Sequence, residues 1–225
     1  MKILYSLLAC LIFSSVNAQK ISKISLSEKG DVSYFSIELD ENVLLQISGD
    51  GSIQSWGIDL YKGRTDRMME KTEPYTGRVE YYTEYDNPSF IGKPKYIGLK
   101  QITYYPDYSD EILRGKVKSI GMSQFEYYSA YDEKELQGRI KKIGTSEIVY
   151  YSIFDISSAV KLKSVGITNI TYYTKMDDKA IQGKVKSIGQ TNFTYYTSYD
   201  RKEWQGAMKN GNRVLYVNGI KFLIR

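Results

Sequence analysis

The chain has 225 residues, a formal net charge of +5, 42 % hydrophobic residues and 22 tyrosines, but no histidine. This length suits one domain, or a small domain joined to a repeat array. The charge is too mild to demand a polyanion such as nucleic acid as partner. The lack of histidine removes the commonest general base and most zinc and copper sites.

Residues 1–18 read as an export signal. Lys2 precedes a largely apolar stretch, residues 3–16, which is too short to span a bilayer as a helix. Val16-Asn17-Ala18 ends in the small residues that a signal peptidase accepts, so the mature chain is predicted to begin near Gln19. A lipoprotein signal is the alternative, because residues 7–10 (Leu-Leu-Ala-Cys) resemble a lipobox.

Cleavage after residue 18 removes Cys10, the only cysteine, so no disulfide framework is expected in the mature chain. No later segment is long and apolar enough to be a transmembrane helix. The prediction is therefore an exported protein without a transmembrane helix, located in the periplasm, at the cell surface or in the medium.

Residues 19–76 are predicted to form an N-terminal cap of short strands followed by a linker. The expected strands are residues 21–26, 32–39, 43–47 and 52–58, which are rich in β-branched and aromatic residues. Gly49-Asp50-Gly51 supplies the positive φ angles that a hairpin turn between the last two strands needs. Residues 61–76 are polar and read as the linker.

Residues 77–206 form a repeat array, marked by Tyr-Tyr pairs at steps of 22 or 23 residues. A half unit, residues 77–91, precedes five units, residues 92–114, 115–137, 138–160, 161–182 and 183–205. Self-similarity at a fixed period indicates a quasi-one-dimensional stack of one supersecondary unit. The six pairs begin at Tyr81, Tyr104, Tyr127, Tyr150, Tyr172 and Tyr195.

Each unit divides into two short strands around a glycine, as residues 184–188 and 193–197 do around Gly189. Alternation points Phe193 and Tyr195 to one face and Tyr196 to the other. Val185 and Ile188 differ in parity, so either a bulge lies between them or both faces of the strand are partly covered. Stacked hairpins predict an all-β fold, either an extended curled antiparallel sheet or a β-solenoid.

Residues 207–225 are predicted to be a C-terminal capping hairpin. Residues 213–217 and 220–224 alternate in hydrophobicity across Asn218-Gly219, a strong hairpin signal. We expect this hairpin to shield the open edge of the last repeat.

The glycines and tyrosines of the unit, Gly183, Gly189 and Tyr195-Tyr196 with their equivalents, resemble MORN-type repeats. That resemblance implies hairpins in an extended sheet, although the glutamate-tryptophan core of a MORN unit is missing. Residues 193–196 are also similar to the aromatic core of choline-binding repeats, but the tryptophans that form the choline cages of such repeats are absent, since Trp204 is the only tryptophan in the array. The whole pattern looks like a family of exported bacterial proteins with GKIKSIG…YY repeats, which implies export and repeat architecture alone.

One carboxylate recurs in the units, at Asp132, Asp155, Asp177 and Asp200. These residues would be calcium ligands or paired glycosidase carboxylates if the site were functional. The favoured interpretation is structural: each Asp starts a loop by accepting hydrogen bonds from its own backbone, because an active site is singular while a structural role repeats.

A basic pair and the second tyrosine of each Tyr-Tyr pair are the candidate binding residues. Alternation places the second tyrosine opposite the core, and cross-strand neighbours lie close enough to form a continuous Lys/Tyr strip. The alternative is that lysine stems and tyrosine rings only cover one another. The strip comprises Lys116, Lys118, Tyr128, Arg139, Lys141, Tyr151, Lys161, Lys163, Tyr173, Lys184, Lys186 and Tyr196.

The sequence therefore predicts a binding module at the cell envelope or surface, with a glycan or a protein as ligand, and no enzyme, cofactor, metal or nucleic acid. A structural or assembly scaffold without a small ligand is the first alternative. A hydrolase based on carboxylates is the second, and the missing histidine and the repetition of the carboxylates count against it.

Overall fold

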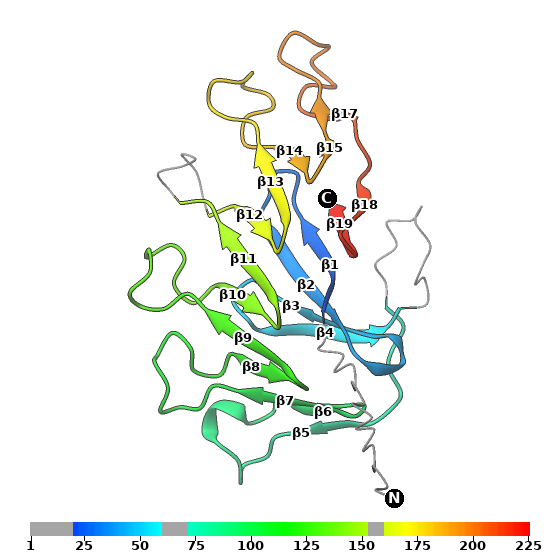
Figure 1. Cartoon of the computed structure of the whole chain (residues 1–225). Coiled ribbons are helices and arrows are strands. Elements are labelled where there is room, and N and C mark those ends of the chain that lie inside the picture. The colour runs from blue at the N-terminus through cyan, green and yellow to red at the C-terminus, as the bar shows by residue number, and fades with distance from the viewer. Residues whose placement is uncertain (1–19, 60–71, 153–159) are drawn as a thin grey trace, which may run out of the picture.

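A computed structural model describes residues 20–59, 72–152 and 160–225, so the predicted signal and most of the predicted linker lie outside the described residues. The described chain is all-β, with two short 3₁₀ turns, η1 (Asp40–Asn42) and η2 (Pro88–Phe90). It forms a long curled sheet of hairpins and a smaller sheet beside it (Figure 1). None of the described residues belongs to a helix with the length and apolarity needed to cross a membrane.

The repeat array is an open antiparallel sheet of eleven strands in sequence order, so the extended curled sheet is confirmed. Each repeat contributes one hairpin, and neighbouring hairpins pair through the strands that flank the long loops. The strands are β5 (Val79–Tyr81), β6 (Pro94–Ile97), β7 (Lys100–Tyr104), β8 (Val117–Ile120), β9 (Ser123–Tyr127), β10 (Ile140–Ile143), β11 (Ser146–Tyr150), β12 (Leu162–Val165), β13 (Thr168–Tyr172), β14 (Val185–Ile188) and β15 (Thr191–Asn192).

The hairpin turns follow from the repeated glycine. Ile120 pairs with Ser123, which leaves a two-residue turn that begins with Gly121. Gly121 has φ 53°, and the equivalent glycines of the next three turns have φ 57°, 53° and 57°. A positive φ at the first turn residue is what a two-residue hairpin with glycine in that place needs, so the predicted turns are confirmed.

A bulge recurs where neighbouring repeats pair. Thr171 pairs with Ser187 and Tyr172 with Val185, so Lys186 is an extra residue on β14. The bulge turns both Val185 and Ile188 toward the core, where each is fully buried. The predicted bulge is therefore confirmed, and the residue that it displaces outward is the second lysine of the unit.

The smaller sheet combines the two ends of the chain in the order β18-β19-β1-β2-β3-β4. The N-terminal strands begin and end within one residue of their predicted positions. The Asn218-Gly219 turn is confirmed, with φ 50° and 79°. The strands are β1 (Ile21–Leu26), β2 (Val32–Glu38), β3 (Val43–Ile47), β4 (Ile53–Ile58), β18 (Val214–Val217) and β19 (Ile220–Ile224).

The C-terminal hairpin does not shield the last repeat, so that prediction is wrong. Strand β19 pairs in parallel with β1, with Ile24 opposite Phe222. The reason lies in β19 itself, because all five of its residues are buried. Such a strand needs neighbours on both sides and cover on its face, which the place between β18 and β1 provides. The last repeat pairs instead with residues that precede the hairpin. Its strand β16 (Thr194–Tyr195) lies antiparallel to the short strand β17 (Met208–Asn210).

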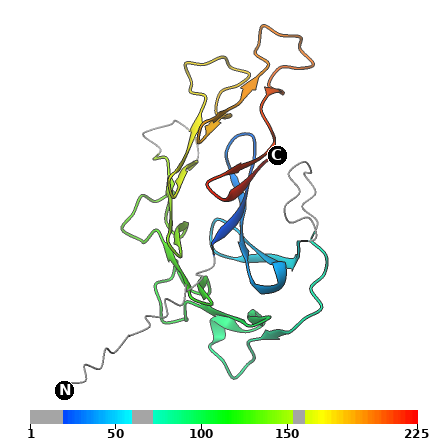
Figure 2. The same cartoon turned by 45° about the vertical axis from the view of Figure 1, so that its right-hand side comes forward.

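The smaller sheet lies against the inner face of the curled array rather than at its ends (Figure 2). Its hairpin turns reach the array directly, because the amides of Val117 and Ile140 donate to the carbonyls of Gly51 and Gly49, at 3.2 and 2.9 Å. The amide of Val185 donates to the carbonyl of Glu28 at 2.8 Å. Buried side chains of both sheets form one hydrophobic core.

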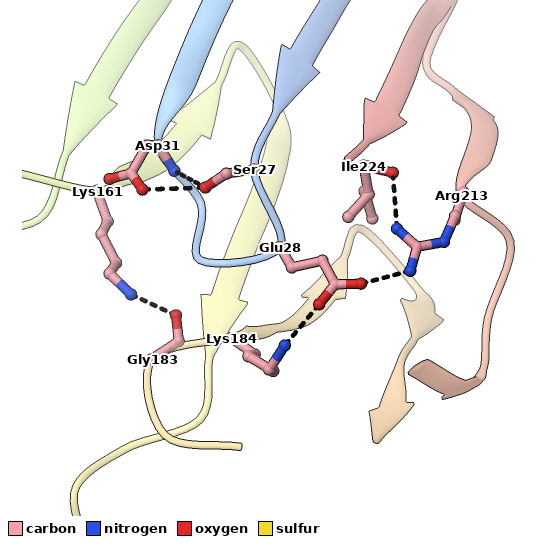
Figure 3. A network of polar contacts seen from close by, with 8 residues as sticks. All are labelled: Ser27, Glu28, Asp31, Lys161, Gly183, Lys184, Arg213 and Ile224. Carbon is pink, nitrogen blue, oxygen red and sulfur yellow. Dashed lines mark hydrogen bonds and ion pairs between the residues drawn. The ribbon is translucent and has the colours of Figure 1, made fainter. Parts of the chain in front are cut away.

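Glu28 joins three parts of the chain at the turn between β1 and β2 (Figure 3). Its carboxylate accepts hydrogen bonds from Lys184 of the array and Arg213 of the C-terminal segment, both at 2.5 Å. Burial alone would raise the pKa of the Glu28 carboxyl, but the hydrogen bonds and charges of Lys184 and Arg213 outweigh it and hold that pKa below its usual range.

Candidate functional site

The second tyrosines of the predicted strip are half-buried, and Tyr128 is buried, because these rings pack against neighbouring residues of the array. Tyr128 is 9 % exposed, its ring meets Tyr150 edge-on at 5.9 Å, and its hydroxyl donates to the carbonyl of Ile148 at 3.2 Å. Tyr105, Tyr151 and Tyr173 repeat the same two contacts with the repeat that follows each of them. The second tyrosine thus joins consecutive repeats, and burial raises the pKa of Tyr128 and Tyr173.

The first cation of each basic pair is also engaged within the molecule. The Lys116 amine donates to the carbonyls of Gly138 and Asp50, at 2.9 and 2.8 Å, and lies over the Tyr127 ring. Burial lowers the pKa of Lys116, although the Asp50 carboxylate opposes that effect. Lys161 is buried and donates to the carbonyl of Gly183. The equivalent cations have other partners: Arg139 donates to the carbonyl of Glu135, and Lys184 donates to the Glu28 carboxylate.

The second lysine of each unit lies over the second tyrosine of the preceding repeat. Lys141 stands 5.2 Å from the centre of the Tyr128 ring, a cation–π distance. The lysine and tyrosine columns therefore do meet, but across repeat boundaries and over rings that are already packed. The contacts are Lys118 with Tyr105, Lys141 with Tyr128, Lys163 with Tyr151, Lys186 with Tyr173, and Lys209 with Tyr196. The alternative in which lysine and tyrosine side chains cover one another is the arrangement found.

The repeated aspartate holds the long loop of its repeat at Asp132, Asp177 and Asp200, as the structural interpretation predicted. Asp132 accepts from the amide and the hydroxyl of Ser129, at 2.6 and 2.8 Å. Thr174 bonds Asp177 and Thr197 bonds Asp200 in the same way. The backbone hydrogen bond lowers the pKa of all three carboxyls. Asp155 lies outside the described residues.

A glutamine closes the same loop from its far end. The Gln137 amide group donates to the carbonyls of Ala130 and Asp132, at 2.9 and 3.1 Å. Leu136, the residue before it, is buried against the core. Gln182 and Gln205 make the equivalent pairs of bonds in their loops. The Asp near the start and the Gln at the end therefore both hold the backbone of each of these loops.

Neighbouring loops also bond to each other near both ends of the array. The Asn87 side chain donates to the Asp107 carboxylate at 2.6 Å and accepts from the Asp107 amide at 3.2 Å. At the other end, the Asp178 carboxylate accepts from the amide of Ser198 at 2.8 Å and from its hydroxyl. These bonds fix how one loop lies relative to the next.

The described long loops emerge from the same side of the array (Figure 1), which we call the loop side. The tip of each described loop carries one large apolar side chain that contacts almost nothing. Among the described residues, the five most exposed large apolar side chains are these tips. The loop-tip row is Tyr85 (91 % exposed), Tyr108 (87 %), Tyr131 (99 %), Met176 (99 %) and Tyr199 (94 %).

The interpretation of the sequence missed the loop-tip row because it followed the Tyr-Tyr pairs themselves. A signal was present: the residue four places after the first tyrosine of each pair is Tyr, Tyr, Tyr, Phe, Met and Tyr in turn. The Phe is residue 154, which lies outside the described residues. The residue just before the tip, in contrast, is acidic, small, apolar, basic or polar in different repeats: Glu84, Asp107, Ala130, Ile153, Lys175 and Ser198.

Within the described residues, acidic side chains do not gather in groups of three or more that could hold a metal ion. Comparison of the chain with models of protein families, with curated proteins and with solved structures finds no match. The resemblance to MORN-type repeats therefore stays a prediction from the sequence. The site has to be interpreted from its own geometry.

Proposed function

We propose that the protein is a binding module of the cell envelope or cell surface that recognises its ligand through the loop-tip row. The observation that carries the proposal is the exposure of the row, between 87 and 99 % at five repeats. A side chain so exposed adds almost nothing to the stability of the fold. Single exposed apolar side chains are ordinary, but five at equivalent positions on one side of the array supply a repeated set of contact points for a partner.

Two further features support a role in binding. The loop backbones that carry Tyr131, Met176 and Tyr199 are held by the Asp and Gln hydrogen bonds described above, so the ordering cost of binding at these tips is small. The tip keeps a large apolar residue in every repeat while the residue before it varies freely, which selection for solubility alone does not explain. Location at the envelope or surface rests on the predicted export signal, residues 1–18.

A structural scaffold is the second candidate, and a specific observation favours it. The Lys/Tyr strip is the most regular feature of the sequence, and its lysine and tyrosine side chains contact neighbouring repeats of the same array. A scaffold would use the array only as a rigid spacer, and its loop-tip row would have no partner.

The experiment compares two triple variants in co-sedimentation with isolated cell envelopes of the source organism. The first, Tyr108→Ala/Tyr131→Ala/Tyr199→Ala, removes three tips on the loop side. The matched control, Leu99→Ala/Met122→Ala/Ile167→Ala, removes exposed apolar side chains from the hairpin turns at the opposite ends of the strands. Envelope binding should be lost in the first variant and kept in the second. Equal binding of both variants, or no binding by the unmodified protein, contradicts the proposal.

A further inference from the structure

The loop-tip row presents equivalent contact points at a regular spacing. Each repeat adds two strands to the sheet, and strands lie about 4.8 Å apart, so successive tips are offset by roughly 10 Å along the array. The same hydrogen bonds hold the loops of Tyr131, Met176 and Tyr199, which makes these contact points alike in orientation as well as in chemistry. A ligand gains from every contact point only if it repeats along its own length.

The tips themselves favour a ligand with apolar faces and polar rims. At 99 % exposure, both faces of the Tyr131 ring are open to solvent. Tyrosine combines a flat apolar body with a hydroxyl that can donate and accept hydrogen bonds. The C–H face of a sugar ring stacks on such a surface, while its hydroxyl groups reach the polar loop beside it.

The charges of the loop side argue against a polyanion as ligand. The second lysines lie over tyrosine rings, and Lys141, Lys186 and Lys209 each lower the pKa of the aspartate in the loop before them. The first lysines donate to carbonyl groups or to Glu28. These contacts leave the lysines charged but direct their amines toward the array, whereas the loops themselves are not basic. The Tyr108 loop carries Asp107, Asp110 and Glu111 against Arg114, and the Tyr131 loop carries Asp132, Glu133 and Glu135 against Lys134, so a polyanion would meet like charges at the tips.

From these observations we infer that the ligand is a neutral polysaccharide that lies along the loop side and contacts one tip per repeat. This inference rests on the proposed function and names the ligand class of the same row. Each contact is weak, because one exposed ring buries little surface. Several contacts on one chain raise the overall affinity steeply, because every contact after the first is intramolecular.

Binding is tested with immobilised neutral polysaccharides (glucans, mannans, xylans and N-acetylglucosamine polymers) and with size-graded oligosaccharides cut from whichever of them binds. Affinity should rise at least tenfold between a disaccharide and a chain long enough to pass several tips. Each single variant, Tyr108→Ala or Tyr131→Ala, should weaken the binding of long chains without abolishing it, because only one of several contact points is lost. The triple variant on the turns, Leu99→Ala/Met122→Ala/Ile167→Ala, should bind as the unmodified protein does.

The outcomes separate this inference from the proposed function. One outcome is that envelope binding depends on the tips yet is lost when the envelopes are first treated with protease, while no polysaccharide binds. In that case the ligand is a protein and this inference is wrong. If a disaccharide binds as tightly as the polymer, the contact is a single site and the inference is wrong. If neither envelopes nor polysaccharides bind in a way that depends on the tips, both proposals fail.

Discussion

Gly51 lies directly against Tyr127: a Cβ atom added to Gly51 would stand 2.2 Å from the Tyr127 hydroxyl. Gly51 belongs to the turn between β3 and β4, and Tyr127 is the first tyrosine of a repeat. The contact is therefore a point where the smaller sheet meets the array. Gly30 meets Tyr172 in the same way, at 2.1 Å from the ring. Two turns of the smaller sheet thus need glycine because a tyrosine ring occupies the space of a side chain.

The Gly51→Ala variant should lose more stability than Gly92→Ala. Both glycines have a positive φ, 86° and 75°, so both variants bear the strain of that backbone conformation. Only Gly51 has a neighbour in the way, since nothing lies within 4 Å of a Cβ at Gly92. We expect Gly51→Ala to cost about 1–3 kcal/mol more in the free energy of unfolding, measured by urea denaturation. Equal losses would mean that the two sheets move apart easily.

The Tyr127→Phe and Tyr150→Phe variants should differ, although the two tyrosines occupy equivalent positions. The Tyr127 hydroxyl donates to the carbonyl of Val117 at 2.6 Å, whereas the buried Tyr150 hydroxyl has no hydrogen-bond partner among the described residues. Loss of the bonded hydroxyl should cost about 0.5–1.5 kcal/mol, while loss of the unpaired one should be neutral or stabilising. Thermal unfolding of both variants checks this. A larger loss for Tyr150→Phe would show that its hydroxyl does have a partner.

The ion pairs of Glu28 should make stability depend on acid pH. The folded protein holds the pKa of Glu28 below its ordinary value of 4.5, so the stabilisation is complete above that pH and is lost as pH falls through the folded-state pKa. At neutral pH, Glu28→Gln should cost about 1.5–3 kcal/mol, and the difference from the unmodified protein should shrink in acid.

The Glu80→Gln variant is the control for Glu28, because the Arg78–Glu80 pair is about half exposed on both sides. It should change stability by less than about 1 kcal/mol at any pH. A difference between Glu28→Gln and the unmodified protein that persists unchanged in acid would contradict the role given to the Glu28 charge.

The Asp177→Ala variant should loosen one loop without unfolding the array. The Asp177 carboxylate accepts from the amide of Thr174, and that hydrogen bond lowers its pKa below the ordinary value of 3.8. Protection of the Thr174 and Met176 amides from hydrogen exchange, taken relative to the intrinsic rate at the same pH, should therefore fall in the variant, and in the unmodified protein only once pH falls below that value. Lys175→Ala, in the same loop, is the control and should leave both exchange rates unchanged.

Much of the fold follows from local sequence rules. The strands of the smaller sheet, the turn glycines such as Gly121 and the Asn218-Gly219 turn were predictable because each depends on a few neighbouring residues. The pairing of β19 with β1 was not, since it joins residues about two hundred positions apart and depends on which buried strand finds cover. The placement of the smaller sheet against the array depends in the same way on distant contacts.

The candidate site divides along the same line. The loop-forming role of Asp132 was predictable, because its hydrogen bonds reach only three residues back. The environment of Tyr128 was not predictable. Strand alternation assigns Tyr128 to the outer side, but the residue lies just past the end of β9, opposite the bulge in β10, and its ring packs against Tyr150 of the next repeat. Tyr131 is exposed because the described residues leave its ring uncovered. A pattern of residue types does not reveal which side chains stay uncovered.

The contacts between the two sheets also constrain how many units the array holds between Ile140 and Val185. The turn between β3 and β4 reaches Val117 and Ile140, while the turn between β1 and β2 reaches Val185. These turns belong to one rigid sheet, so their separation is constant. Insertion of one more unit between Ile140 and Val185 would shift the second anchor by two strand widths, roughly 10 Å, and unseat it. The smaller sheet thus fixes the distance between the two anchors. This array cannot gain or lose inner units without breaking an anchor, whereas open-ended repeat proteins can.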